Sequence, residues 1–433
     1  MKEISKFQLV LMVIFGACIL IGVMIFAVGR FGNTQNPVTL TVWGPFTSEV
    51  FSTLVENSPL YQNKLIQITY VPKTVQQLEA DLVNEIASGR SPDLFFLPQD
   101  LIVKYQSKVY PIPYASLSER DFKDVFIEEG ELYLAPDGVM GIPFVVDPLV
   151  MFWNRTIFSN AGLSLPPKYW SELYDLAPKL TTKDEGGNVR QSVVSLGEYT
   201  NVSNAMDVLG ALAMQAGGVL SRRSGSQVES TIDDNNGAPL VPASVALSYY
   251  TEFSNPLKPF YSWNRSLPLS KNYFIAGQLA LYMGYASEVA DIQSKNPNLN
   301  FNVAMLPQSP EAKQKVTFGR MMAWAIPKAS QHKDTAISAA LMLVNSQALQ
   351  ELSNTIQLPP VRRDLLTQRP TEAYMSVFYD AAIQSRAWLQ PDRDQTNAVF
   401  KEMIESVTGG RRTPAEAVDR AHDELEVLFN NTQ

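Results

Sequence analysis

GIPFVVDPLVMFWNRTIF, residues Gly141 to Phe158, is an apolar run as dense as that of a buried strand. Pro143, Asp147 and Pro148 interrupt this run. A strand paired regularly within a sheet would tolerate them poorly, because proline lacks a backbone N–H donor and a buried carboxylate needs a partner. The composition therefore predicts a strand that does not take part in a regular ladder.

Strands and helices alternate on the N-terminal side of this run. Strands are predicted at residues 38–43, 65–71 and 93–97, and helices at residues 48–56 and 74–89. The second helix begins with a capping-box signature, Thr74 with Gln77, and Gly89 ends it. This repeated βαβ order is typical of a mostly parallel sheet covered by helices, so we expect an α/β fold.

The C-terminal side of the run continues with mixed elements. Asp137-Gly138 predicts a hairpin turn, and residues 272–306 have the pattern helix, strand, helix, strand. The polar segments 182–190 and 221–237 are expected to form exposed loops or β-excursions. Further helices are predicted at residues 169–180, 204–215, 333–346, 371–384, 394–407 and 414–428. A chain of 433 residues exceeds the size at which one core keeps growing, so two lobes are expected.

The N-terminal segment Phe7 to Val28 contains 22 residues without a charge. As a helix it would span roughly 33 Å, which matches the hydrocarbon core of a bilayer. Lys2 and Lys6 precede it and only Arg30 follows closely, which favours an N-terminus in the cytoplasm. We therefore expect residues 1–37 to form a cytoplasmic stub, a transmembrane anchor and a linker. The protein would be single-pass in the cell membrane, with the bulk of the chain extracellular or periplasmic.

Two other interpretations of this apolar segment stay open. A cleaved signal peptide would have a shorter apolar region followed by a small-residue cleavage site. A lipoprotein signal would make Cys18 the new N-terminus, and Phe15-Gly16-Ala17-Cys18 resembles a poor lipobox. The ten residues after Cys18 are still apolar, however, and this favours the anchor.

The composition argues against several classes of function. Hydrophobic residues make up 45% and charged residues 18% of the chain, and the net charge is −8. A nucleic-acid partner is not expected, because phosphate binding needs clustered Lys and Arg. Cys18 is the only cysteine, so the outer part has no disulfides and no cysteine metal site. His332 and His422 are expected at the surface, and we expect no metal and no cofactor.

Sequence motifs of catalysis are absent as well. The sequence contains no HExxH, CxxC, GxSxG or GxxxxGK[ST], and no GxGxxG after a strand. We therefore expect no catalytic residues and no enzyme. A carboxylate pair for glycoside hydrolysis stays open as an alternative, because such pairs have no fixed spacing in sequence.

Five blocks of sequence point to a known family. They are GIPFVVDPLVMFWNRTIFSNAGLSLPPKYWSELYDLAPKLT (141–181), ASGRSPDLFFLP (87–98), FIAGQLALYMGYAS (274–287), FGRMMAWAIPKAS (318–330) and TGGRRTPAEAVDRAHDEL (408–425). Their order resembles that of the extracellular solute-binding proteins of ABC importers. The resemblance is to the large carbohydrate-binding family that includes maltose-binding proteins, and it covers nearly the whole chain after Trp43.

The resemblance implies a two-lobed periplasmic-binding-protein-like fold with a ligand cleft at a hinge. The chain would leave the first lobe at Pro143–Pro148 and return to it at Gly319–Ala325. Lobe 1 would comprise residues 38–144 and about 326–369. Lobe 2 would comprise residues 145–325 and about 370–433. Asp147 would then lie where the chain crosses the cleft.

Ligand-binding residues are expected at the strand ends and crossings that face this cleft. A sugar is held by aromatic planes and by carboxylate, amide and guanidinium groups. The tryptophans have core packing as an alternative, and Asp100 could instead cap a helix. Trp263 is expected to be exposed, and two or three of the six tryptophans are expected to line the cleft. The candidates are Trp43, Phe46, Asp100, Asp147, Trp153, Trp263, Tyr285, Glu288, Arg320, Trp324 and Trp388.

The function implied by the resemblance is capture of a small solute for an ABC importer. The expected ligand is a sugar or oligosaccharide, the expected partner is an ABC permease, and the protein is expected to be a monomer. Two alternatives remain: a ligand-binding receptor that reports to a membrane sensor, and an anchored glycoside hydrolase.

Overall fold

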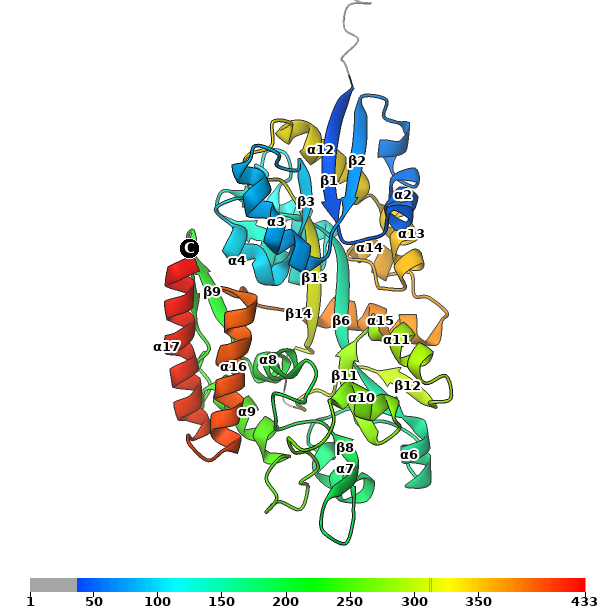
Figure 1. The fold of residues 1–433 in the computed structure, drawn as a ribbon, viewed down its shortest axis with the longest axis vertical. Coiled ribbons are helices and arrows are strands. Elements are labelled where there is room, and N and C mark those ends of the chain that lie inside the picture. Colours follow the sequence, from blue (N-terminus) through cyan, green and yellow to red (C-terminus); the bar gives the residue numbers. More distant parts are fainter. Residues whose placement is uncertain (1–36, 311, 313, 433) are drawn as a thin grey trace, which may run out of the picture.

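The computed structural model describes residues 37–310, 312 and 314–432. Figure 1 shows an elongated molecule in which an upper and a lower lobe are joined by long central strands. The predicted transmembrane segment 7–28 lies outside the described residues. No helix within the described ranges is long and apolar enough to cross a membrane.

The upper lobe contains a parallel sheet formed as the sequence predicts. Its strands β1 (Val38–Gly44), β2 (Ile66–Pro72) and β3 (Leu94–Pro98) have the order β2-β1-β3. The connecting helices are α2 (Ser48–Glu56) and α3 (Val75–Ala87). The capping box predicted at the start of α3 is present, so the βαβ pattern is confirmed in this lobe.

Two long strands run from the upper lobe into the lower one. They are β6 (Ile142–Asn154) and β13 (Thr317–Ala325), which pair antiparallel along their shared length (Figure 1). Both prolines of β6 lie inside this ladder, so the prediction that β6 would not pair regularly is wrong. The ladder shifts its register next to Pro143, and a bulge of this kind accommodates a residue without an N–H donor.

The lower half of β6 organises the second lobe. It pairs antiparallel with β11 (Leu279–Tyr285) and with β12 (Phe301–Ala304), while β8 (Val189–Val194) pairs parallel with β11. The parallel arrangement, which the sequence predicts from the βαβ order of residues 38–97, does not extend into this lobe. The sheet is mixed because the strand that enters from the other lobe runs opposite to β11 and β12.

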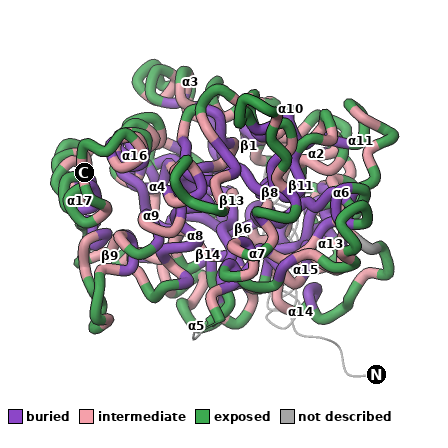
Figure 2. Tube along the Cα trace, turned by 90° about the horizontal axis from the view of Figure 1, so that it is seen from below, coloured by how far each residue is buried: buried purple, intermediate pink, exposed green. Residues whose placement is uncertain are grey.

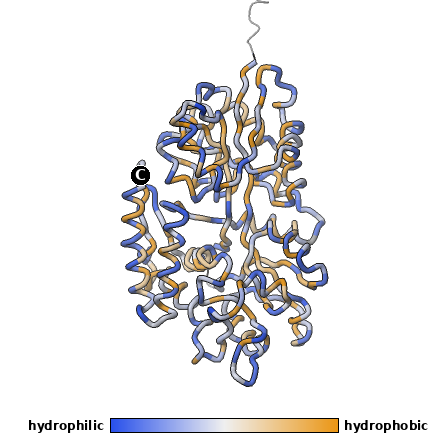
Figure 3. Tube along the Cα trace, in the orientation of Figure 1, coloured by the Kyte–Doolittle hydropathy of each residue, from blue (hydrophilic) through white to orange (hydrophobic). Residues whose placement is uncertain are grey.

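Helices cover the lower lobe. α8 (Ala205–Gln215) is almost completely buried, and most of its residues are apolar, as its pale orange colour in Figure 3 shows. α16 (Arg393–Thr408) and α17 (Pro414–Thr432) lie side by side on the outside, and α9 (Pro242–Glu252) packs against them and against α8. Figure 2 shows the central strands buried and the outer faces of these helices exposed.

A third segment also passes between the lobes. α14 (Arg363–Leu366) packs against α5 (Glu119–Val125) of the upper lobe, whereas α15 (Ala373–Gln384) packs against β6 and β12. Residues 367–372 therefore make a further crossing. β14 (Ser385–Arg386) then pairs with β13 at the centre of the molecule.

The remaining elements follow the predictions in most places. The pattern of helix, strand, helix, strand between residues 270 and 304 and the hairpin at Asp137-Gly138 are confirmed. These elements are η1 (Pro59–Gln62), η2 (Gln99–Leu101), α4 (Ile102–Tyr105), η3 (Glu128–Tyr133), β4 (Leu134–Ala135), β5 (Gly138–Val139), α6 (Arg155–Asn160), α7 (Glu172–Leu180), β7 (Thr182–Lys183), β9 (Ser221–Ser224), β10 (Gln227–Ser230), α10 (Ser270–Ile275), α11 (Glu288–Lys295), α12 (Lys333–Leu343) and α13 (Ser346–Ile356).

Candidate functional site

A cavity of about 390 Å³ lies between the lobes, beside β13. Its walls come from the end of β3 in the upper lobe, from the start of α8 in the lower lobe, from β13 and from the first turns of α16. Carboxylate, amide and guanidinium groups are prominent in the lining. The polar lining residues are Gln99, Asp100, Tyr199, Asn204, Asp207, Arg320, Gln390, Arg393 and Asn397.

Arg320 reaches from β13 towards α8 and is held there by two groups. Its Nη2 atom lies 2.8 Å from Oδ2 of Asp207, and its guanidinium carbon lies 3.8 Å from the centre of the Tyr285 ring. The Tyr285 hydroxyl donates to the same Asp207 oxygen at 2.6 Å. These partners offset the desolvation of the buried Asp207 carboxylate. About half of the Arg320 side chain stays exposed, which leaves donors free for a ligand.

Asp147 and Glu288 order the loop beneath this arginine. Asp147 lies opposite Arg320 in the β6–β13 ladder and accepts hydrogen bonds from the backbone N–H and the hydroxyl of Ser287, at 3.0 and 2.6 Å. Desolvation by the surrounding protein raises the pKa of Asp147 to about 6, against the opposing effects of Ser287 and Arg320. Glu288 accepts a hydrogen bond from the backbone N–H of Tyr285 at 2.9 Å, which fixes the end of β11.

Charged residues also pair between the lobes at this cavity. Asp100 in η2 forms an ion pair with Arg393 at the start of α16, and Lys104 lies 2.9 Å from Asp392. The second oxygen of Asp100, Oδ1, and Oε1 of Gln390 are buried without a hydrogen-bond partner. A buried acceptor without a donor costs free energy, so ligand hydroxyl groups that reach these atoms would remove that cost.

The predicted aromatic residues of the upper lobe lie outside this cavity. Trp324 is completely buried and stacks on Phe144, with ring centroids 4.2 Å apart. Phe46 packs edge-on against the Phe144 ring, with ring centroids 5.7 Å apart. Trp43 is also buried, and Nζ of Lys73 lies 4.5 Å from the centre of its ring. These side chains pack the upper lobe around the start of the central strands.

The predicted tryptophans of the lower lobe are buried too. Trp263 was expected to be exposed, and this prediction is wrong because its side chain is completely enclosed. Its ring packs edge-on against Tyr273, and its Nε1 donates to Oδ1 of Asn201 at 3.1 Å. Trp153 packs edge-on against Phe158, with ring centroids 5.3 Å apart.

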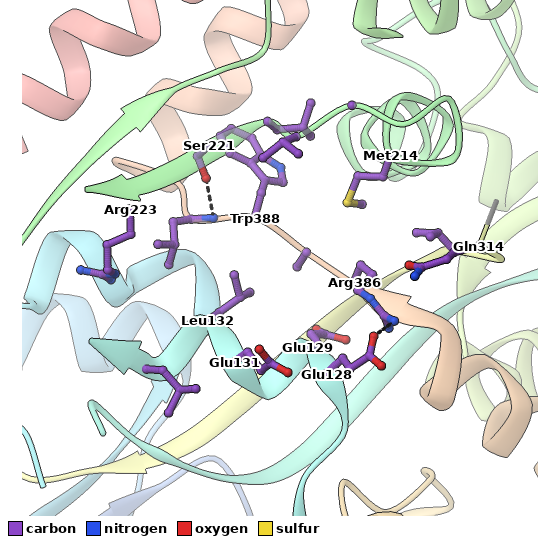
Figure 4. Close-up of a pocket in the computed structure, with 17 residues that line it drawn as sticks. Glu128, Glu129, Glu131, Leu132, Met214, Ser221, Arg223, Gln314, Arg386 and Trp388 are labelled. Atoms are coloured by element: carbon purple, nitrogen blue, oxygen red, sulfur yellow. Dashed lines mark hydrogen bonds and ion pairs between the residues drawn. The ribbon is translucent and has the colours of Figure 1, made fainter. Parts of the chain in front are cut away.

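Trp388 borders a second cavity between the lobes, of about 470 Å³. Figure 4 shows the chain that carries Arg386 and Trp388 crossing this region, with the acidic side chains of η3 near Arg386. Glu128 pairs with Arg386. The neighbouring Glu129 is 1% exposed, and no cation pairs with it among the ion pairs of the described residues. Burial raises the pKa of Glu129 to about 8.

Of the eleven predicted site residues, the structure therefore places Asp100 and Arg320 in the lining of the first cavity. Tyr285, Asp147 and Glu288 lie next to Arg320 or support its neighbours. The five predicted phenylalanine and tryptophan residues other than Trp388 line neither of these two cavities.

The family of the chain follows from its sequence as a whole. The model for the bacterial extracellular solute-binding protein family matches residues 49–345. The chain belongs to this family. The order of the sequence blocks, the three crossings and the cavity between the lobes are consistent with that assignment.

Curated relatives of this solute-binding protein match it over part of their length. A putative binding protein of Brucella abortus (strain 2308) is 27% identical over 141 residues, 32% of either chain. A maltooligosaccharide ABC transporter solute-binding lipoprotein of Streptococcus pneumoniae serotype 4 is 24% identical over 253 residues, 58% of this chain and 55% of the relative. The chain thus matches between about a third and just over half of the length of these relatives.

Solved structures share the fold over nearly the whole described chain. The cyclic alpha-maltosyl-1,6-maltose binding protein from Arthrobacter globiformis superposes with a TM-score of 0.76 at 17% identity, covering 92% of this chain and 100% of that one. A cyclo/maltodextrin-binding protein complexed with maltotetraose gives a TM-score of 0.73 at 15% identity, covering 91% and 98%. The two-lobed periplasmic-binding-protein-like fold predicted from the sequence is therefore confirmed.

Six polar residues that line the cavity beside β13 are not among the residues predicted from the sequence of this solute-binding protein. They are Tyr199, Asn204, Asp207, Gln390, Arg393 and Asn397. Asn204 has a left-handed backbone, with φ of 60°, directly before α8. An asparagine ahead of an apolar helix is a weak signal for such a position. Among the described residues, no group of three or more His, Cys, Asp or Glu could hold a metal ion.

Proposed function

We propose that this protein binds a carbohydrate between its lobes and delivers it to the permease of an ABC importer. The observation that carries the proposal is the polar lining of the cavity beside β13, where carboxylate, amide and guanidinium groups of both lobes converge. Sugar hydroxyls both donate and accept hydrogen bonds, so they suit such a mixed lining. The family assignment and the relative named as a maltooligosaccharide-binding lipoprotein support this ligand class.

The proposed mechanism is closure of two lobes around the ligand. In this proposal lobe 1 comprises residues 38–144 and about 326–369, and lobe 2 comprises residues 145–325 and about 370–433. Asp100 would hold the ligand from the first lobe, while Asn204 and Asp207 would hold it from the second. A ligand that contacts both lobes binds the closed form more tightly and so shifts the balance towards closure, as in other periplasmic binding proteins.

We further propose that the protein performs no covalent chemistry and works as a monomer tethered to the membrane. Residues 7–28 would form a single-pass anchor. The relative named as a lipoprotein supports attachment to the membrane and keeps lipidation at Cys18 as the alternative. In both cases the binding lobes would stay close to a permease in the same membrane.

A thermal-shift screen of the full chain in detergent against mono- and oligosaccharides tests the ligand class. A ligand at 100 times its dissociation constant should stabilise the protein by about 2.7 kcal/mol. Arg320→Met and Asp207→Asn should weaken binding of that sugar. Arg265→Met is a matched control, because Arg265 forms a similar pair with the buried Glu198 but does not line the cavity.

The same screen can contradict the proposal. If no sugar stabilises the wild-type chain, or if Arg320→Met binds as tightly as Arg265→Met, the cavity is not a carbohydrate site. Hydrolysis of a chromogenic glycoside that is lost in Asp207→Asn would support the glycosidase alternative instead.

A further inference from the structure

Gln99 has an unusual position at the boundary between β3 and the cavity. It follows directly after the last residue of β3, and its side chain is 3% exposed. The side-chain Nε2 atom donates to the carbonyl oxygen of Gly319 at 2.5 Å, and the backbone N–H of Met321 donates to Oε1 at 2.9 Å. Both partners belong to β13, on either side of Arg320.

These two hydrogen bonds extend the β3–β13 ladder past the point where the two backbones pair. β3 and β13 pair antiparallel up to Met322 opposite Pro98. The chain then turns into the helical segment η2, so this edge of β13 loses its main-chain partner at Gly319 and Met321. A buried peptide group without a partner is costly. The amide of Gln99 has the donor and the acceptor of a peptide group, and it takes the place of the missing strand residue.

The residue enclosed by these two bonds is Arg320. Its opposite edge is held by β6, where Asp147 is the paired residue. The backbone around Arg320 is thus fixed on both edges, one by a strand and one by a side chain. From this fixed base the guanidinium group reaches Asp207 and lies over the ring of Tyr285.

We propose that Gln99 is a positioning residue for the cleft: its amide fixes β13 at Arg320, so that the Arg320 guanidinium is presented to the ligand. The inference rests on the proposed function of the cavity as a carbohydrate site. Gln99 lines that cavity too, but in this role it acts through Arg320. A displacement of about 1 Å of the strand is enough to misplace a group that must meet a ligand hydroxyl within hydrogen-bond distance.

Tyr133 provides a matched control within the same fold. Its hydroxyl is also buried and lies 2.7 Å from the carbonyl oxygen of Leu97 and 3.1 Å from that of Met321. Tyr133→Phe therefore removes a buried hydrogen-bond donor to the same strand but leaves both bonds of Gln99 intact. Gln99→Met removes both bonds of Gln99 and keeps the length of the side chain.

The first measurement needs no ligand. Amide hydrogen exchange of the full chain reports the protection of β13, residues 317–325. Gln99→Met should lower the protection of the Met321 amide by about tenfold or more, since this N–H loses its acceptor, whereas Tyr133→Phe should leave that amide protected. Unchanged protection in Gln99→Met overturns the inference.

The second measurement is the dissociation constant of the sugar found in the thermal-shift screen. Gln99→Met and Arg320→Met should each weaken binding about tenfold or more, and the double variant should bind no more weakly than Arg320→Met alone. Tyr133→Phe and Arg320→Met should show additive effects. Additive effects of Gln99→Met and Arg320→Met overturn the positioning role.

Gln99→Glu adds a pH-dependent rescue. The protonated carboxyl of this variant can still donate to Gly319 and accept from Met321. The ionised form cannot donate, and the Gly319 carbonyl oxygen repels its charge, which moves the side chain away from β13 and from the Met321 N–H. Protection of the Met321 amide should therefore be near that of wild type at low pH and fall as pH rises, and a flat profile contradicts the inference. If no sugar binds wild type, the proposed function fails, and the exchange measurements still decide whether Gln99 fixes β13.

Discussion

The carboxyl group of Glu129 occupies the space that a side chain on Gly319 would need. A β-carbon added to Gly319 would collide with both carboxyl oxygens of Glu129, which is almost completely buried. Successive residues of a strand face opposite sides. The glycine therefore allows Glu129 to pack against one face of β13, while Arg320 is presented to the cavity on the other face.

Gly319→Ala should destabilise the protein by about 1–3 kcal/mol, the usual cost of overpacking. Glu129→Ala in the same chain should recover most of that loss, because it removes the group that collides. Chemical denaturation measures the free energy of unfolding of the single and the double variant. Gly210→Ala serves as the control, since its added carbon meets only ordinary contacts. A double variant as unstable as Gly319→Ala alone would contradict the packing relationship.

Glu129→Gln should change how stability depends on pH. Burial raises the pKa of Glu129 from the ordinary 4.5 to about 8. Between these values the folded protein keeps a proton that the unfolded chain has lost, so stability falls as pH rises, by up to about 1.4 kcal/mol per pH unit. The free energy of unfolding of Glu129→Gln should decline less steeply between about pH 5 and 8. Parallel curves for the two proteins would argue against a buried, protonated Glu129.

Asp100→Asn should loosen the contact between the lobes in the absence of ligand. It removes the ion pair with Arg393 and leaves the neighbouring pair of Lys104 and Asp392. We expect a larger radius of gyration by small-angle X-ray scattering. High salt should shift wild type in the same direction, because charges are screened within about 3 Å at 1 M. Glu424→Gln breaks a pair within α17 only and should have no effect; identical scattering of all three proteins would count against this role of Asp100.

Trp263→Ala should cost about 3–5 kcal/mol of stability, as large-to-small substitutions in a core do. The side chain is fully buried and its indole N–H is bonded to Asn201. Denaturant unfolding measures the loss. Tyr61→Ala, at a side chain that is 66% exposed, provides the comparison. An equally small effect of both substitutions would mean that Trp263 is not a core residue.

Local sequence signals predicted much of the secondary structure. The Thr74–Gln77 capping box starts α3, because its contacts lie within a single turn. The prolines of β6 misled the prediction of its pairing. Whether a missing N–H matters depends on how the two strands pair, and β6 itself forms the bulge next to Pro143, with Phe144 as the extra residue.

The sequence by itself determined the α/β class, the order of the elements and the family, since these depend on periodicity, on caps and on blocks that are continuous along the chain. Only the tertiary structure decided which side chains meet between the lobes. Asp207 and Arg320 are separated by 113 residues, and Asp100 and Arg393 by 293, yet each pair is in contact. The local sequence around an apolar or aromatic residue does not distinguish a core position from a position at a cavity. The difference depends on which distant faces come together, and for this reason Trp263 is buried while the cavity is lined mainly by polar groups.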